Sequence, residues 1–261
     1  MRDLREISGI PISVDGLDVR FSDGLTAVKP SVRRLQEIRD VLYNQTAAGP
    51  EDLYFMYRGV VLPEHRSIAE CHSIRYDITV IRPGAIGTEY IKTAGHYHAH
   101  VPGESVEYPE IYEVLSGRAH YLLQRPGEQP GTVDDVVVVE AGPGDKVVMP
   151  PGYGHVTINP GPEPLVMCNL VEATFTSNYG PYRQARGAAF YEVENGDKGV
   201  FVPNEHYGYA PAPRLVDPAD LPELGLRRGV PLYTCMITEP ERLAFLVRPQ
   251  DFEEHLSGLL E

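Results

Sequence analysis

The feature that most constrains this chain is a succession of short segments rich in β-branched and aromatic residues, from about residue 52 to about residue 175. Most of these segments end in Gly or Pro, and the 261 residues include 25 Gly and 24 Pro. Short apolar segments separated by turn residues are typical of an antiparallel sandwich or barrel. We therefore predict an all-β fold built from LYFMYRGVVL, SIRYDITVIRPG, TEYIKTAGHYHAH, EIYEVLSGRAHYLLQRPG, VDDVVVVEAGPG, DKVVMPPGYGHVTINPG and PLVMCNLVEAT.

The segments outside this block are expected to cover the barrel. Residues 1–28 look like short extended pieces. Residues 30–44 predict an amphipathic helix, because apolar side chains recur there with helical spacing at Val32, Leu35, Ile38 and Leu42. Residues 176–215 look irregular, and the remainder contains the strand-like pieces VPLYTCMI and LAFLV and a terminal helix, PQDFEEHLSGLLE.

We accordingly predict three parts. Residues 1–50 supply N-terminal strands and a helix that pack on the barrel, residues 51–195 form the barrel with a metal site, and residues 196–261 form a C-terminal extension. The extension is an annex and a candidate dimer element, and the sequence leaves its role open.

Charge and cysteine content exclude several functions. The formal net charge is −14, and no basic patch is interleaved with aromatic residues, so nucleic acid is not an expected partner. The three cysteines, Cys71, Cys168 and Cys235, are widely spaced, which fits free thiols in a reducing cytosol. The N-terminus lacks an apolar leader, and the apolar runs are shorter than the roughly 20 residues of a membrane span. We expect a cytoplasmic protein without membrane contact.

One group of residues carries the chemistry. His96 and His98 alternate in a strand-like segment, so both imidazoles face the same side. Glu110 follows, and a Gly- and Pro-punctuated segment later brings His155. Three imidazoles and one carboxylate suit a single divalent ion, and six-coordination would leave adjacent positions for substrate oxygens. These donors are compatible with Fe2+, Mn2+, Ni2+ or Zn2+.

These segments resemble the two signature motifs of the cupin superfamily, whose fold is a jelly-roll barrel. The second motif, G-x5-P-x-G-x2-H-x3-N, spans residues 144–159 and matches at every fixed position. In the first motif, eleven residues, AHVPGESVEYP, lie between His98 and Glu110 and bring further carboxylates. Glu110 is assigned as the ligand because the motif's E-x6-G spacing leads from it to Gly117.

Three stretches resemble one cupin family more closely, the cupin-type glucose-6-phosphate isomerases of archaea and some bacteria. They are KPSVRRL, ITVIRPGAIGTEYIKTAGHYHAH and PEIYEVLSGRAHYLLQ, within a resemblance that covers roughly residues 25–195. The resemblance implies interconversion of glucose 6-phosphate and fructose 6-phosphate, in glycolysis and gluconeogenesis, by a homodimer that depends on a divalent metal ion. It also makes Fe2+ the ion expected first.

The resemblance also implies roles for individual residues. Glu110, His155 and Tyr112 would be catalytic, and the sugar phosphate would contact Tyr54, Thr79, Thr93, Gly95 and Tyr179. Hydroxyl and backbone N–H groups can hold a phosphate without a cationic cluster. The chain departs from the archaeal pattern at Gly152, Val171 and Ser177, where a Tyr, a Tyr and a His would be expected.

Other functions remain open at this point. Cupins with the same ligands also include dioxygenases, and a metal-bearing cupin can bind a sugar phosphate without catalysis. For an isomerase, both an enediol route with Glu110 as base and a hydride shift without a base are compatible with the sequence.

Overall fold

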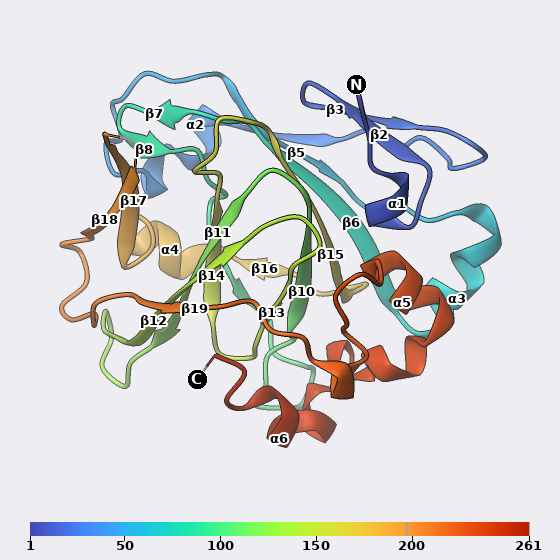
Figure 1. Cartoon of the computed structure of the whole chain (residues 1–261). Coiled ribbons are helices and arrows are strands. Elements are labelled where there is room, and N and C mark those ends of the chain that lie inside the picture. Colours follow the sequence, from blue (N-terminus) through green and yellow to red (C-terminus); the bar gives the residue numbers. More distant parts are fainter. Residues whose placement is uncertain (197, 261) are drawn as a thin grey trace.

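Two β-sheets face each other across the centre of the molecule and enclose its main core (Figure 1). The computed structural model describes residues 1–196 and 198–260. The six-stranded sheet is antiparallel and has the order β13 (Lys146–Met149), β10 (Glu110–Ser116), β15 (Leu165–Glu172), β6 (Ile74–Ile81), β5 (Asp52–Tyr57), β4 (Ser31–Arg34). The facing sheet has the order β14 (Gly154–Ile158), β11 (Ala119–Pro126), β12 (Val133–Ala141), β19 (Arg214–Val216), with β19 parallel to β12. The prediction of an all-β cupin barrel is confirmed.

Smaller elements surround this barrel. Three small sheets are formed by β1 (Arg2–Asp3), β2 (Ile12–Asp15) and β3 (Asp18–Phe21); by β9 (Tyr97–His98) and β16 (Ser177–Asn178); and by β7 (Ala85–Ile86), β8 (Glu89–Tyr90), β17 (Phe190–Asn195) and β18 (Lys198–Pro203). The α-helices are α1 (Arg5–Ser8), α2 (Leu35–Ile38), α3 (Arg66–Cys71), α4 (Gly180–Gln184), α5 (Leu232–Thr238) and α6 (Glu253–Leu256). The 3₁₀ helices are η1 (Arg39–Val41), η2 (Pro63–His65), η3 (Pro222–Leu224), η4 (Pro240–Leu246) and η5 (Pro249–Phe252). None of the described helices is long and apolar enough to cross a membrane.

Strand alternation gives the six-stranded sheet two different faces. Along β10, Tyr112 and Val114 belong to the core between the sheets, whereas Ile111 and Leu115 belong to a second core on the outer face. The inner face therefore looks into the barrel, where a ligand can be enclosed, and the outer face must be covered by other parts of the chain.

The two ends of the chain provide that cover. The outer core joins Ile78 of β6 to Ile12 of β2 and to Leu232 and Phe245 of the C-terminal segment, and all four side chains are buried. In Figure 1 the blue N-terminal strands and the red C-terminal helices lie on the same side of the barrel. Burying apolar area on both faces of the sheet is the main stabilising contribution expected here.

A buried ion pair fixes the C-terminal segment to the outer face. Lys146 of β13 donates to Glu113 of β10 at 2.8 Å, and both side chains are almost completely buried. Glu113 also accepts the backbone N–H of Leu232 at 2.7 Å, and Lys146 donates to the carbonyl of Arg227 at 3.1 Å. The division of the chain into three parts stays a prediction, but the last part shares its core with the barrel sheet.

The predicted helix over residues 30–44 is confirmed only for residues 35–41, which form α2 and η1. Residues 31–34 form the edge strand β4, which pairs with β5 through Ser31–Met56 and Arg33–Tyr54. The helix begins only at Leu35, after the N–H of Arg34 is capped by the Glu37 side chain at 2.8 Å. Pairing with a neighbouring strand outweighs the helical spacing of the apolar residues.

Two expectations for the last third of the chain are also wrong. The strand-like piece VPLYTCMI forms helix α5, in which the buried residues Leu232, Tyr233, Cys235 and Met236 follow a helical spacing, and LAFLV lies in and after η4. The stretch 176–215, expected to be irregular, contains the β17–β18 hairpin, α4, β16 and β19. The terminal helix is confirmed in part, as η5 and α6.

Candidate metal centre

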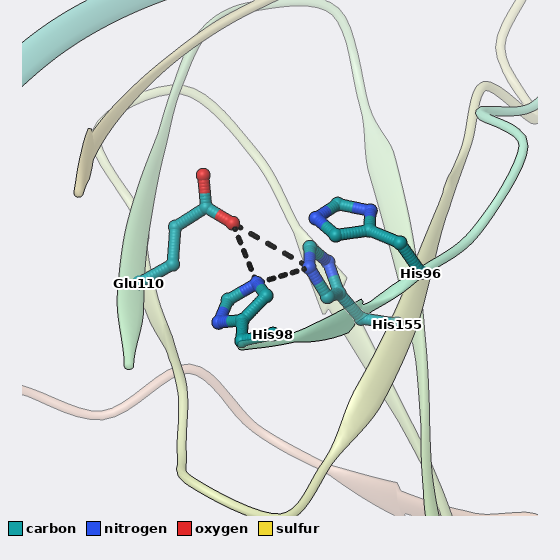
Figure 2. A group of neighbouring side chains, drawn as sticks. All are labelled: His96, His98, Glu110 and His155. Carbon is teal, nitrogen blue, oxygen red and sulfur yellow. Dashed lines mark hydrogen bonds and ion pairs between the residues drawn. The ribbon is translucent and has the colours of Figure 1, made fainter. Parts of the chain in front are cut away.

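The four residues expected to bind metal come together inside the barrel. His98 lies on β9, Glu110 begins β10 and His155 lies on β14, while His96 precedes β9 and exchanges two backbone hydrogen bonds with His155. Figure 2 shows the three imidazoles and the carboxylate pointing toward one another. One candidate ligand atom from each residue lies within 4.8 Å of all the others. Pairing of the backbone at His96 with that at His155 thus brings the distant His155 next to His96 and His98.

Hydrogen bonds orient the cluster for ligation. His98 Nδ1 lies 2.6 Å from the carbonyl oxygen of Tyr108, and a carbonyl only accepts, so Nδ1 carries the proton. The lone pair of neutral His98 is therefore on Nε2, which lies 3.1 Å from His155 Nε2 and 3.2 Å from Glu110 Oε2. A backbone carbonyl that accepts the N–H of a metal-binding histidine, and so fixes its tautomer, is a common arrangement.

The two oxygens of Glu110 have different environments. Oε1 accepts a hydrogen bond of 2.7 Å from the side-chain amide of Asn169. Oε2 faces His98 and His155, at 3.2 and 3.4 Å from their Nε2 atoms, yet it is buried and accepts no hydrogen bond from any described residue. A buried carboxylate oxygen without a donor is costly, and a cation would compensate it.

The ionisation of the histidines also favours a metal ion. Burial, and then the neighbouring imidazoles, lower the pKa of His155 well below the usual 6.5. Burial likewise lowers the pKa of His96, with His98 as the next cause. Both rings are therefore neutral near pH 7, the form that binds metal. The donor set and the uncompensated oxygen fit one divalent ion held by His96, His98, Glu110 and His155.

The structure explains why the extra carboxylates of the insertion are absent from the cluster. Residues 99–109 fold back as a short hairpin, with a bridge between His100 and Glu107. Glu107 accepts the backbone N–H of Gly152 at 2.9 Å, and Glu104 is exposed. Neither carboxylate of this stretch joins the histidines, whereas Glu110, directly after it, does.

A cavity of about 400 Å³ opens above His96 and Glu110. Its floor is the inner face of the six-stranded sheet, where alternate residues point inward. They are Glu110 and Tyr112 on β10, Met167 and Asn169 on β15, Arg75, Asp77 and Thr79 on β6, Tyr54 and Met56 on β5 with Arg58 beyond it, and Arg33 on β4. Phe175, Thr176, Ser177 and Tyr179 line its side.

All five residues expected to contact a sugar phosphate line this cavity. They are Tyr54, Thr79, Thr93, Gly95 and Tyr179. Tyr54 Oη accepts the backbone N–H of the residue before Gly95 at 3.3 Å, so the Tyr54 hydroxyl lies beside the T-x-G-H element. Gly95 has φ +77°, and a Cβ there would lie 2.6 Å from the Tyr182 ring, which excludes a side chain. The structure thus places the five residues around one cavity, and their contact with a sugar phosphate stays a proposal.

Sequence reasoning missed the cationic lining of the cavity. Arg33, Arg58 and Arg75 all contribute to it, although hydroxyl and backbone N–H groups without a cationic cluster were expected to hold a phosphate. The Arg33 guanidinium lies over the rings of Tyr54 and Tyr179, at 6.0 and 5.6 Å from their centroids. Its Nε is buried and donates to no described residue, while one terminal nitrogen lies 3.8 Å from exposed Glu37.

Arg75 is partly neutralised within the cavity. Its Nε lies 3.0 Å from both carboxylate oxygens of Asp77, which also accepts the N–H of Gly59. Burial raises the pKa of Asp77, and the guanidinium opposes that shift. Arg33 is therefore the arginine with an unpaired buried donor on the described lining. Alternation along β4 was the signal that could have found it, had residues 31–34 been assigned to a strand.

Tyr112 lies beside the metal cluster. Its ring centroid is 5.6 Å from that of His155, and it points inward two residues after Glu110. Burial raises the pKa of Tyr112 well above 10, and the negative charge of Glu110 raises it further. Its hydroxyl therefore keeps its proton near neutral pH and can donate it in a hydrogen bond.

The three departures from the archaeal pattern have different surroundings. Val171 is fully buried on β15 and stands opposite Arg75 in register. Ser177 lines the cavity and pairs with His98. Gly152 has φ +83° and donates its N–H to Glu107. Ser177 is therefore the one departure of the three that lines the cavity, where it replaces the larger side chain of an expected His.

Comparison with known proteins was decisive for the family. A family model described as glucose-6-phosphate isomerase matches residues 30–209, more than half of the chain. The chain belongs to the glucose-6-phosphate isomerase family. The family resemblance inferred from the motifs is confirmed.

Individual relatives agree with this assignment. A protein named glucose-6-phosphate isomerase from Thermococcus litoralis is 28% identical over 188 residues, which covers 69% of this chain and 90% of that protein. The protein of the same name from Pyrococcus furiosus is 27% identical over 195 residues, covering 71% and 93%. Among solved structures, oxalate decarboxylase from Bacillus subtilis has a TM-score of 0.33 at 20% identity, over 48% of this chain and 28% of that one.

Proposed function

We propose that this chain is a metal-dependent isomerase that interconverts glucose 6-phosphate and fructose 6-phosphate. The observation that carries the proposal is the joint geometry of one cavity. Three imidazoles and a carboxylate converge on one point, and two of these residues, His96 and Glu110, line a cavity that is also lined by Thr and Tyr residues, Gly95 and Arg33. The family assignment and the names of the relatives support the same substrate class.

The cavity suits a sugar phosphate held at both ends. A phosphate carries a charge of about −2 and three acceptor oxygens near neutral pH. Thr79, Thr93 and Tyr54 can donate hydroxyls to it, and Arg33 can add a charge-assisted hydrogen bond. The carbonyl end of the sugar would then face Glu110 and Tyr112.

The reaction moves one hydrogen from C2 to C1 and one proton from O2 to O1. A divalent ion on the cluster would supply positive charge against the negative charge that develops on the sugar oxygens. Tyr112 can donate a hydrogen bond to one of these oxygens, because its hydroxyl stays protonated. Glu110 is the proposed base of the enediol route, and His155 is proposed to assist proton transfer between the oxygens.

Finer assignments belong to the same proposal. Fe2+ is the proposed ion, with Mn2+, Ni2+ or Zn2+ as alternatives, since imidazole and carboxylate donors accept each of them. The homodimer, the cytoplasmic location and the place in glycolysis and gluconeogenesis stay predictions.

Metal removal tests the proposed function directly. Chelator-stripped protein is expected to have no fructose 6-phosphate isomerase activity in a coupled assay, and one added divalent ion is expected to restore it. The ion that restores most activity identifies a competent metal. Protein that binds metal tightly but turns over no sugar phosphate with any ion would refute the proposal, and oxygen uptake would then test the dioxygenase alternative.

Arg33 provides a second test, of the phosphate end. Arg33→Met keeps an unbranched, mostly apolar stem but removes the guanidinium, and kcat/KM for fructose 6-phosphate is expected to fall about 10- to 100-fold, the effect of losing one hydrogen bond to a charged group. Most of the change should appear in KM, because the phosphate is remote from the reacting carbons. Arg34→Met is the matched control, since Arg34 is exposed and pairs with Asp52. Equal KM values for the two variants would contradict the assignment.

A further inference from the structure

A buried amide on the cavity lining lies next to the metal cluster. Asn169 lies on β15, is 5% exposed, and stands in register with Tyr112 on β10 and Asp77 on β6. Its side-chain nitrogen donates to Glu110 Oε1 at 2.7 Å. A carboxylate oxygen only accepts, so the NH2 group of the amide must be the one that faces Glu110.

We propose that Asn169 is a positioning residue that makes Glu110 offer a single oxygen to the metal ion. Oε1 is engaged by the amide, while Oε2 is buried, lacks a described donor and faces His98 and His155. A carboxylate without such a partner can bind a cation through one or both oxygens. Because the amide holds Oε1, Glu110 can bind the ion through Oε2 only. The amide is neutral and therefore adds no charge to the cluster.

The consequence concerns the positions that stay free for substrate. Three imidazoles and one carboxylate oxygen leave about two positions on a six-coordinate ion. If both Glu110 oxygens were bound, one of these positions would be lost, and a sugar could no longer approach through two adjacent oxygens. Asn169 thus keeps the site open for a substrate with oxygens on neighbouring carbons. This consequence rests on the proposed function, whereas the effect on Glu110 rests only on the metal site.

The test replaces the amide by an apolar side chain in Mn2+-loaded protein. Asn169→Leu approximates the shape of the amide, and Asn169→Val suits a strand and guards against failure of the first variant to fold. The readout is the broadening of the Mn2+ magnetic resonance signal by isotope-labelled water, without any sugar phosphate. We expect the broadening to fall to about half of the native value in both variants, since the freed oxygen displaces one water.

Asn204→Ala is the matched control. Asn204 is also 5% exposed and donates to the carbonyls of Ala185 and Ala188, away from the cavity lining. Asn204→Ala should lower the stability of the protein but leave the broadening of the Mn2+ signal at its native value. Native broadening in Asn169→Leu and Asn169→Val would overturn the proposal, and so would complete loss of Mn2+ binding in folded protein, because Glu110 must still bind.

Activity gives a separate readout. In the two Asn169 variants kcat/KM for fructose 6-phosphate is expected to fall about 10- to 100-fold, as is typical when a partner of a metal ligand is removed. If native protein proves inactive, the proposed isomerase fails, yet the water measurement still decides whether Asn169 controls Glu110.

Discussion

Replacing Glu110 by glutamine is expected to lower kcat for the sugar-phosphate interconversion about 100- to 10,000-fold, the range for loss of an acid–base group, and to weaken metal binding. Asn169 donates to Oε1, so the glutamine oxygen will turn toward Asn169. The glutamine NH2 must then face the Nε2 atoms of His98 and His155, where Oε2 lies in the native protein. An amide NH2 has no lone pair to offer, so size is conserved while the ligand is lost.

Two measurements check this prediction. The Mn2+ dissociation constant reports the loss of the ligand, and the coupled isomerase assay at saturating metal reports kcat. Glu104→Gln is the control, because Glu104 lies in the insertion that directly precedes Glu110, has the same side chain and is exposed. Native kcat and metal affinity in Glu110→Gln, or equal losses in the two variants, would show that the carboxylate assignment is wrong.

Local spacing was sufficient to predict the metal cluster but not its surroundings. His96 and His98 share a face because strands alternate, and the motif around His155 is continuous in sequence. Asn169 and Arg33 were not predicted as part of the site, because their positions depend on the register between strands that are distant in sequence. Asn169 is 59 residues from the carboxylate it contacts. The polar Asn169 inside the apolar run PLVMCNLVEAT was the available signal, since a buried polar group needs a partner.

In the fold, too, elements with a local sequence signal were predicted, and elements that depend on distant contacts were not. Alternation and turn residues predicted the barrel strands, because each segment carries its own signal. Val32 and Arg33 were assigned to a helix because the gain from pairing with β5 is not visible in residues 30–44 themselves. Leu232 and Met236 were assigned to a strand because a short apolar run does not distinguish a buried helix from a strand. Their helical form appears only where the segment covers the outer sheet face.

The attachment of that segment gives the second large expected effect. Lys146→Met is expected to lower the free energy of unfolding by about 3–5 kcal/mol near pH 8, because it leaves the buried Glu113 carboxylate without its cation. Burial already raises the pKa of Glu113, and Lys146 is the main opposing influence. Without Lys146 the folded-state pKa rises further above the unfolded value of about 4.3. The destabilisation is therefore complete above the folded pKa and diminishes as the pH falls toward the unfolded pKa.

Urea unfolding near pH 8 and near pH 5 measures both the size and the pH dependence of this effect. Arg248→Met is the control, since Arg248 and Asp251 form an exposed pair at 3.4 Å whose loss should cost less than about 1 kcal/mol at either pH. The double variant Lys146→Met with Glu113→Gln should recover part of the loss, because no uncompensated charge then stays buried. A single variant as stable as the control at pH 8, or one destabilised more at pH 5 than at pH 8, would mean that the buried pair does not hold the C-terminal segment on the sheet.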